Sequence, residues 1–278
     1  MNESGNRGGF IRKGWEKAAR GYRDGLGVHL EPVARHLADL LRPVKRFPVL
    51  DLACGPGTVL KYVWNSDPEG PGIGCDFSRE MVGIAVSRVR LSCGVVADQD
   101  NLPFAPKSFG TVASSMGTIF STVPDRQIPE IAGVLSPGGV YGFSAWGKPE
   151  ECELRGVSES VIGNWPYPYE GKMPPLESPY SAGRTDWLES VSRKAGFRID
   201  RVESGKLTFR FPDRDTAARA LVETGRLALL LQDLPNNPEY ERELLERARE
   251  AFSPHTDPGT GVVSLSNSYH VFVLIRME

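Results

Sequence analysis

Residues 49–58, with the sequence VLDLACGPGT, constrain the fold more than any other part of this chain. An apolar run that carries an acid at Asp51 leads into a turn with glycines at Gly55 and Gly57. A helical pattern begins directly after the turn, at Thr58. Glycines let a backbone approach a ligand closely, and the first N–H groups of a helix attract carboxylate or phosphate groups. The segment therefore predicts a ligand-binding turn between a buried strand and a helix.

The same order of strand and helix repeats along the next part of the chain. Predicted strands lie at 49–53, 72–77, 94–97, 111–115 and 140–146. Predicted helices lie at 58–65, 78–90 and 125–135, and a turn at 136–139 closes the last of them. Strands that alternate with helices at this spacing form βαβ units and a mainly parallel sheet. Such a sheet binds its ligands at the carboxyl ends of the strands, near the point where the strand order reverses.

The flanking segments carry different patterns. Residues 14–41 have apolar side chains at helical spacing with a break within 21–27, whereas residues 1–9 are polar, glycine-rich and expected to be mobile. Residues 147–184 are rich in proline, glycine and aromatic residues, which is typical of a lid or binding loop. Further helices are predicted at 185–195 and 213–252, with an interruption at 234–238, and further strands at 197–211 and 268–275.

Composition excludes several classes of protein. The 278 residues include 33 basic and 35 acidic side chains, so the chain lacks the basic excess expected of a nucleic-acid-binding protein. No apolar run reaches the roughly 18 residues of a membrane span, and residues 1–15 lack the apolar core of a signal peptide. The four cysteines form no CxxC pair, which predicts reduced thiols, no metal site and a cytoplasmic location.

Two ligand classes compete for the glycine turn. A dinucleotide fingerprint reads G-x-G-x-x-G, but here Leu60 occupies the third glycine position and Asp51 lies four residues before Gly55. Both departures count against NAD. They favour a ligand whose amino-acid end carries an ammonium group as well as a carboxylate.

Two further acids follow later strands. Asp76 ends the second predicted strand, where a carboxylate accepts hydrogen bonds from both hydroxyls of a ribose. Asp98 follows the third predicted strand, where it would accept a hydrogen bond from the amine of adenine. Each acid also has a structural alternative, since Asp51 and Asp98 are common turn residues and Asp76 would serve as a helix cap.

The segments VLDLACGPGT, GCDFS, ADQDNLPF and VLSPGG, in this order, resemble the motifs of class I S-adenosylmethionine-dependent methyltransferases. The similarity is greatest to the small-molecule branch that includes ubiquinone and menaquinone methyltransferases, and it covers about residues 45–146. It implies a Rossmann-like, doubly wound α/β sheet of seven strands with N-terminal helices and a helical cap insertion. Five parallel strands would be followed by an antiparallel pair near 197–211 and 268–276.

The resemblance also implies a division of the chain. A helical segment that covers the cofactor cleft occupies 1–44, and the S-adenosylmethionine-binding core occupies 45–146. The aromatic and proline-rich lid occupies 147–184, and the C-terminal part of the core, with the helical insertion 213–252, occupies 185–278. Four aromatic residues of the lid region are expected either to line the acceptor pocket or to pack in the ordinary way: Trp165, Tyr167, Tyr169 and Tyr180.

The cofactor ligands implied by the resemblance lie mainly at strand ends. The glycine-rich motif would hold the methionine moiety, Asp76 the ribose and Asp98 the adenine, while Ser115 and Met116 would pass close to the sulfonium. Tyr22 matches an aromatic residue that closes over the cofactor. The whole predicted set is Tyr22, Asp51, Ala53, Gly55, Gly57, Asp76, Phe77, Met81, Asp98, Gln99, Ser115 and Met116. The chain departs from the family pattern at Ala53, Ala97 and Gly110.

Histidine is the side chain best suited to act as a general base near neutral pH. Among the four histidines, His29 and His255 are the candidate catalytic residues, and each also has a structural alternative. His36 and His270 are weaker candidates.

The expected activity is in-line transfer of a methyl group from S-adenosylmethionine to a small organic acceptor, which leaves S-adenosylhomocysteine. Two alternatives remain at this stage. One is a protein of the same fold that binds the cofactor without transferring methyl, in a regulatory or cyclisation role, and the other is a methyltransferase that acts on RNA or protein. The expected partner is the small acceptor alone, without nucleic acid, and the chain is expected to be a monomer or a homodimer.

Overall fold

A computed structural model describes residues 3–63, 70–89, 93–121, 123–167 and 185–278. The chain divides into two compact units, each built from three separate segments. The first, called the helical unit below, comprises Met1–Leu30, Pro149–Glu177 and Lys206–Ser268. The second, called the sheet unit, comprises Glu31–Lys148, Ser178–Gly205 and Tyr269–Glu278.

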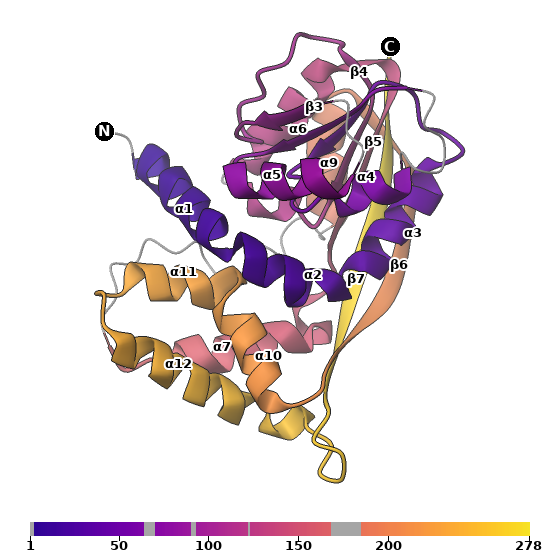
Figure 1. Cartoon of the computed structure of the whole chain (residues 1–278). Helices are drawn as coiled ribbons and strands as arrows, with labels where there is room; N and C mark the ends of the chain where they lie inside the picture. Colours follow the sequence, from indigo (N-terminus) through magenta and orange to yellow (C-terminus); the bar gives the residue numbers. More distant parts are fainter. Residues whose placement is uncertain (1–2, 64–69, 90–92, 122, 168–184) are drawn as a thin grey trace. The chain divides into compact units, whose positions relative to one another are not determined.

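The sheet unit contains the α/β elements that the sequence predicts (Figure 1). Its strands are β1 (Val49–Leu52), β2 (Gly72–Asp76), β3 (Cys93–Val96), β4 (Phe109–Ser115) and β5 (Leu135–Trp146), together with parts of β6 (Phe197–Phe211) and β7 (Val263–Arg276). Its helices are α3 (Glu31–Leu41), α4 (Thr58–Val63), α5 (Arg79–Arg88), η1 (Thr118–Phe120), α6 (Pro124–Val134) and α9 (Thr185–Lys194).

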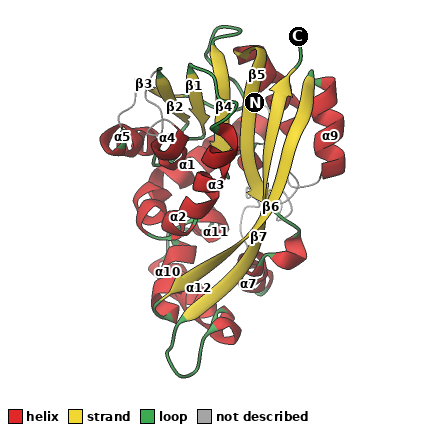
Figure 2. Ribbon diagram, turned by 90° about the vertical axis from the view of Figure 1, so that its right-hand side faces the viewer, coloured by secondary structure: helices red, strands yellow, loops and turns green. Residues whose placement is uncertain are grey.

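The seven strands form one sheet in the order β3-β2-β1-β4-β5-β7-β6 (Figure 2). β1 pairs in parallel with both β2 and β4, so the strand order reverses at β1. β7 runs antiparallel to β5, with Ser144 opposite Val271 and Trp146 opposite Tyr269. The predicted doubly wound, seven-stranded α/β sheet is confirmed, and the reversal places the ligand-binding edge at the carboxyl ends of β1 and β4.

Apolar packing on both faces holds this sheet together. The rings of Tyr141, Phe143 and Phe272 stack with centroid separations of 5.0 and 4.8 Å on one face. On the other face α3 lies directly on β5, because a Cβ at Gly142 would come within 3.0 Å of both Leu37 and Leu41. Full burial of a Leu or Phe side chain contributes roughly 1.5–3 kcal/mol, so these contacts fix α3 firmly on the sheet.

The helical unit contains α1 (Glu3–Asp24), α2 (Leu26–His29), η2 (Pro149–Glu151), α7 (Glu153–Gly163), α10 (Arg214–Val222), α11 (Gly225–Asp233), α12 (Pro238–Ala251) and η3 (Ser253–His255). The predicted interruption of the long helical segment is confirmed between α11 and α12. Among the described residues, no helix combines the length and apolar character needed to cross a bilayer.

Two stretches of this unit are helical where the sequence does not predict a helix. Residues 3–9 belong to α1, and their expected mobility stays a prediction. Phe10 and Ile11 of the same helix are buried, and the side chain of Gln232 on α11 donates a 2.8 Å hydrogen bond to the Phe10 carbonyl. These tertiary contacts outweigh the low helix propensity of the glycines.

The second unexpected helical stretch lies within the predicted lid, 147–184, whose role as a lid stays a prediction. Residues 153–163 form α7, which buries Val157, Val161 and Ile162 along one side. The sequence contains this helical spacing, but the surrounding prolines and aromatic residues obscured it. Residues 168–184, with the predicted lid residues Tyr169 and Tyr180, lie outside the described part of the chain.

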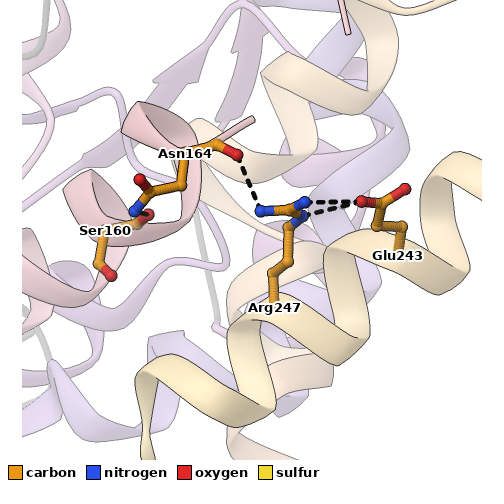
Figure 3. A network of polar contacts seen from close by, with 4 residues as sticks. All are labelled: Ser160, Asn164, Glu243 and Arg247. Carbon is orange, nitrogen blue, oxygen red and sulfur yellow. Dashed lines mark hydrogen bonds and ion pairs between the residues drawn. The ribbon is translucent and has the colours of Figure 1, made fainter. Parts of the chain in front are cut away.

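A network of polar contacts joins the C-terminal end of α7 to α12 (Figure 3), and aromatic rings pack beside it. Arg247 donates hydrogen bonds to Glu243 Oε1 at 2.8 and 3.0 Å and to the Asn164 carbonyl at 2.8 Å. Its guanidinium lies 5.9 Å from the ring centroid of Trp165. Trp165 in turn contacts Tyr167 and Tyr240 at 5.4 and 6.1 Å. Trp165 and Tyr167 therefore take part in packing within the helical unit.

Candidate cofactor site

Asp51 is the most unusual side chain at the carboxyl ends of the parallel strands. It is fully buried on β1, and neither carboxylate oxygen has a hydrogen bond of standard geometry to any described residue. Burial raises the pKa of Asp51 well above its ordinary value, the Leu60 N–H opposes this increase, and the Asp76 carboxylate adds to it. Buried polar groups in native proteins are normally paired, so Asp51 lacks a partner, and a ligand with a cationic group would supply one.

The two glycines of the turn have different surroundings. Both adopt positive φ, +50° at Gly55 and +81° at Gly57. A Cβ at Gly55 would meet no atom within 4 Å, whereas a Cβ at Gly57 would lie 3.0 Å from Val89 and 3.2 Å from Ala85. Gly57 thus lets the turn approach the segment formed by α5 and Val89. Gly55 presents bare backbone to open space, which fits a ligand laid against it.

Asp76 connects the turn to the end of β2. Its Oδ2 accepts a 2.9 Å hydrogen bond from the Gly55 N–H, and its Oδ1 accepts one of the same length from the Ser78 N–H. The N-cap of α5 is Ser78, whose hydroxyl accepts a bond from the Met81 N–H, so the predicted alternative of Asp76 as the cap is wrong. The two backbone bonds hold the Asp76 carboxylate at the carboxyl end of β2, beside the glycine turn.

The segment after β3 contains a hydrogen-bonded turn and a buried acceptor oxygen that has no hydrogen bond to any described residue. Asp98 Oδ1 accepts a 2.9 Å hydrogen bond from the Asp100 N–H, as expected for the alternative in which Asp98 is a turn residue. Gln99 donates through Nε2 to the Gly117 carbonyl at 3.3 Å. The Oε1 of Gln99 is buried and makes no hydrogen bond with any described residue.

The chain turns sharply after β4. Met116 is buried and has φ of +55°, a conformation rare for a residue with a long side chain. Its N–H donates to Ser144 Oγ on β5 at 3.0 Å, and that hydroxyl lies 3.1 Å from Ser115 Oγ. Strained backbone of this kind gathers at functional sites. Sequence reasoning missed Ser144, and its only signal was the expected adjacency of the fourth and fifth strands.

The sheet unit brings most of the predicted cofactor residues to the carboxyl ends of β1 to β4. Phe77 follows β2, and Met81 lies in the first turn of α5 with its side chain buried. Tyr22 belongs to the helical unit, where its ring packs edge-on against Trp15 at 5.3 Å. A contact between Tyr22 and a cofactor stays a prediction.

The two predicted catalytic histidines also belong to the helical unit. His29 stacks on Phe209 at 5.0 Å and meets Phe211 edge-on at 4.7 Å, and burial lowers the pKa of His29. His255 lies in η3 with its Nδ1 3.8 Å from a carboxylate oxygen of Glu153. These surroundings give each histidine a structural role. Their catalytic role stays a prediction.

The thiols near the site are poor metal ligands in this environment. Burial raises the pKa of Cys54 well above its ordinary value and raises the pKa of Cys75 to about 12, so both are protonated near neutral pH. Metals bind thiolate rather than thiol. Among the described residues, no three His, Cys, Asp or Glu side chains gather in a way that would hold a metal ion.

Comparison with known proteins agrees with this geometry. Residues 49–139 match a family model described as a methyltransferase domain. The chain is 30% identical over 174 residues to malonyl-[acyl-carrier protein] O-methyltransferase of Herminiimonas arsenicoxydans, covering 61% of this chain and 64% of the relative. It is 27% identical over 184 residues to the human mitochondrial protein named arginine-hydroxylase NDUFAF5, covering 66% of this chain and 51% of the relative. The match therefore spans between half and two thirds of these relatives.

A solved structure supports the fold. The chain superposes on a proposed methyltransferase from Bacillus halodurans with a TM-score of 0.57 and 17% sequence identity, covering 87% of this chain and 99% of that one. At this level of identity the likeness establishes the architecture alone.

Proposed function

We propose that this chain is a class I S-adenosylmethionine-dependent methyltransferase and that it transfers the methyl group of S-adenosylmethionine to a small organic acceptor. The match of residues 49–139 to a methyltransferase domain supports this proposal. The observation that carries the proposal is Asp51, a buried carboxylate without a hydrogen-bond partner beside a turn whose backbone is bare at Gly55. S-adenosylmethionine has an ammonium group that would pair with such a carboxylate, and it supplies a methyl group on a sulfonium.

We assign roles to the remaining residues on the same basis. Asp76 accepts the ribose hydroxyls, and its bonds from the Gly55 and Ser78 N–H groups hold the carboxylate in place. Asp98 and Gln99 contact the adenine, and the unfilled Oε1 of Gln99 supports a ligand donor there. The turn at Met116, anchored to Ser144, defines the wall beside the reacting methyl group. Alignment and exclusion of water are the main protein contributions to such a displacement.

The names of the relatives give different reactions, O-methylation of malonyl-[acyl-carrier protein] for the bacterial enzyme and hydroxylation of arginine for the human protein. Because the match covers only part of each relative, we transfer neither substrate to this chain. A small acceptor is favoured by the net charge of −2, which provides no general attraction for RNA.

The test is incubation of the purified protein with methyl-labelled S-adenosylmethionine and a small-molecule extract, followed by mass spectrometry. We expect a labelled product and S-adenosylhomocysteine in equal amounts. The variant Asp51→Asn, which lacks the buried charge, serves as the negative control. Cofactor binding without any labelled product would contradict methyl transfer, and label in protein or RNA alone would contradict the small acceptor.

A further inference from the structure

A second group of polar side chains lies at the carboxyl end of β5, on the face of the sheet that α3 covers. Side chains alternate between the two faces of a strand, so Gly142, Ser144 and Trp146 share one face of β5. Tyr269 is paired with Trp146 and lies on that face too, one strand farther along the sheet. The hydroxyl of Ser144 on this face bonds to the Met116 N–H of the proposed cofactor site. Tyr269 therefore lies at the same edge of the sheet as that site.

Two further side chains complete a chain of hydrogen bonds with Tyr269. The Tyr269 hydroxyl lies 3.1 Å from Nδ1 of His36 on α3. Nε2 of the same imidazole lies 3.0 Å from Oε2 of Glu203 on β6. These three residues, called the Tyr269 relay below, come from three elements of the sheet unit. Other charged groups on α3 have their own contacts, Arg35 over the Tyr62 ring and Asp39 with Arg42.

The backbone of β6 is shaped to admit this phenol. A Cβ at position 205 would lie 2.4 Å from both Cζ and the hydroxyl oxygen of Tyr269, so only glycine fits there. Tyr269 itself is 7% exposed, and burial raises its pKa. The phenol is therefore held in one place and stays protonated near neutral pH.

When the imidazole of His36 is neutral, the chemistry of the three groups assigns each proton. A carboxylate only accepts hydrogen bonds, so Nε2 of His36 must carry a proton to donate to Glu203. In the neutral imidazole Nδ1 is then an acceptor, and it receives the hydrogen bond of the Tyr269 hydroxyl. This order of carboxylate, imidazole and hydroxyl lets the hydroxyl proton move to the imidazole while the carboxylate stabilises the resulting cation.

We propose that the Tyr269 hydroxyl takes the proton that the substrate loses when it is methylated. His36 and Glu203 act as positioning residues for Tyr269. The substrate group that receives the methyl is a protic group such as a phenol, an enol or an ammonium. This inference rests on the proposed methyl transfer. As the acceptor atom forms its bond to the methyl carbon, the carbon–sulfur bond breaks and its electron pair stays on sulfur. The acceptor proton passes to the Tyr269 oxygen, and the Tyr269 proton passes to His36 Nδ1. A carboxylic acid is already ionised at neutral pH and needs no such relay.

The test compares wild type with Tyr269→Phe and His36→Gln on a panel of phenols and amines, with carboxylic acids as a second panel. We expect label on a phenol or an amine. We expect kcat to fall by about 10²-fold or more in Tyr269→Phe, the usual contribution of a general base. The affinity for S-adenosylmethionine, measured by calorimetry, should not change, because the relay does not bind the cofactor.

His270 supplies the matched control. It neighbours Tyr269 on β7 but faces the other side of the sheet, where Nδ1 lies 2.7 Å from Ser204 Oγ. His270→Gln should keep the wild-type kcat. Nitrogen NMR of His36 shows which ring nitrogen carries the proton, a property that a role in packing alone would not fix. We expect the neutral tautomer with the proton on Nε2.

Three outcomes would overturn the inference. The first is a proton on Nδ1 in neutral His36. The second is an unchanged kcat in Tyr269→Phe with a wild type that is active, in which case methyl transfer stands without the relay. The third is a wild type that binds the cofactor and labels no acceptor, in which case methyl transfer and the relay both fail.

Discussion

At the scale of single residues, Asp51 combines complete burial with the absence of a standard hydrogen bond to any described residue. Burial raises its pKa, so the folded chain without ligand binds a proton at this carboxyl more tightly than the unfolded chain does. By linkage, stability from this group is complete below the ordinary aspartate pKa of about 3.9 and is lost as pH rises toward the raised folded value. The ammonium of the proposed cofactor would reverse that loss.

The first prediction concerns the variant Asp51→Asn. Without ligand, its free energy of unfolding should fall less than that of wild type as pH rises above about 4, because no buried charge has to form. Its affinity for S-adenosylmethionine should fall by about 1.5–3 kcal/mol, the loss of a charged hydrogen bond. Chemical denaturation across pH and calorimetry measure the two effects. Parallel stability profiles for the variant and wild type would show that Asp51 is not the responsible group.

At the scale of elements, the turn between β1 and α4 depends on two glycines with opposite surroundings. Gly57 adopts positive φ against Ala85 and Val89, whereas Gly83, in the middle of α5, has nothing within 4 Å of its Cβ position. The same substitution at these two positions therefore tests whether the turn needs glycine for its conformation and its close approach to α5.

The second prediction uses this pair. Gly57→Ala should lower the free energy of unfolding by at least about 1–2 kcal/mol, because alanine is strained at positive φ and its Cβ contacts Ala85 and Val89 closely. Gly83→Ala should raise the free energy of unfolding by about 0.5–1 kcal/mol, because alanine is favoured inside a helix. Urea denaturation measures both. Equal effects at the two positions would contradict the local geometry of the turn.

The sequence predicts the elements around the glycine turn well because their signals are local. Ser78 caps α5 as a residue of its type should, and buried strands such as β1 and β4 follow from apolar runs. α7 was missed because the surrounding prolines and aromatic residues obscured its helical spacing. The start of α1 was missed because its glycines disfavour a helix, and a tertiary contact at Phe10 outweighs them. The Tyr269 relay could not be predicted from the sequence for another reason. His36 lies 167 residues from Glu203 and 233 residues from Tyr269 along the chain. No spacing rule connects positions so far apart.

At the scale of the whole molecule, the proposed cofactor residues other than Tyr22 belong to the sheet unit, while the network around Arg247 belongs to the helical unit. Arg247 makes its hydrogen bonds to Glu243 on its own helix and to the Asn164 carbonyl beyond α7. Its removal would therefore test the stability of the helical unit separately from the chemistry of the sheet unit.

The third prediction follows from that separation. Arg247→Ala should lower the free energy of unfolding by about 1–2 kcal/mol, through loss of the hydrogen bond to Asn164 and of contact with the Trp165 ring. Its affinity for S-adenosylmethionine should equal that of wild type. Arg242→Ala, which removes an exposed pair with Glu239, is the control and should change the free energy of unfolding by less than about 0.5 kcal/mol. Loss of cofactor affinity in Arg247→Ala would show that the helical unit contributes to that site.

The unpaired carboxylate of Asp51 has a practical consequence for anyone who engineers this chain. Selection for heat resistance without ligand would favour substitutions that remove the buried charge. The surviving variants would be thermally stable and inactive. The same library, screened with the cofactor added in excess, would retain the carboxylate, because bound ligand stabilises only the chains that still hold it. The choice of screening buffer would then decide whether evolution in the laboratory preserves or erases the activity.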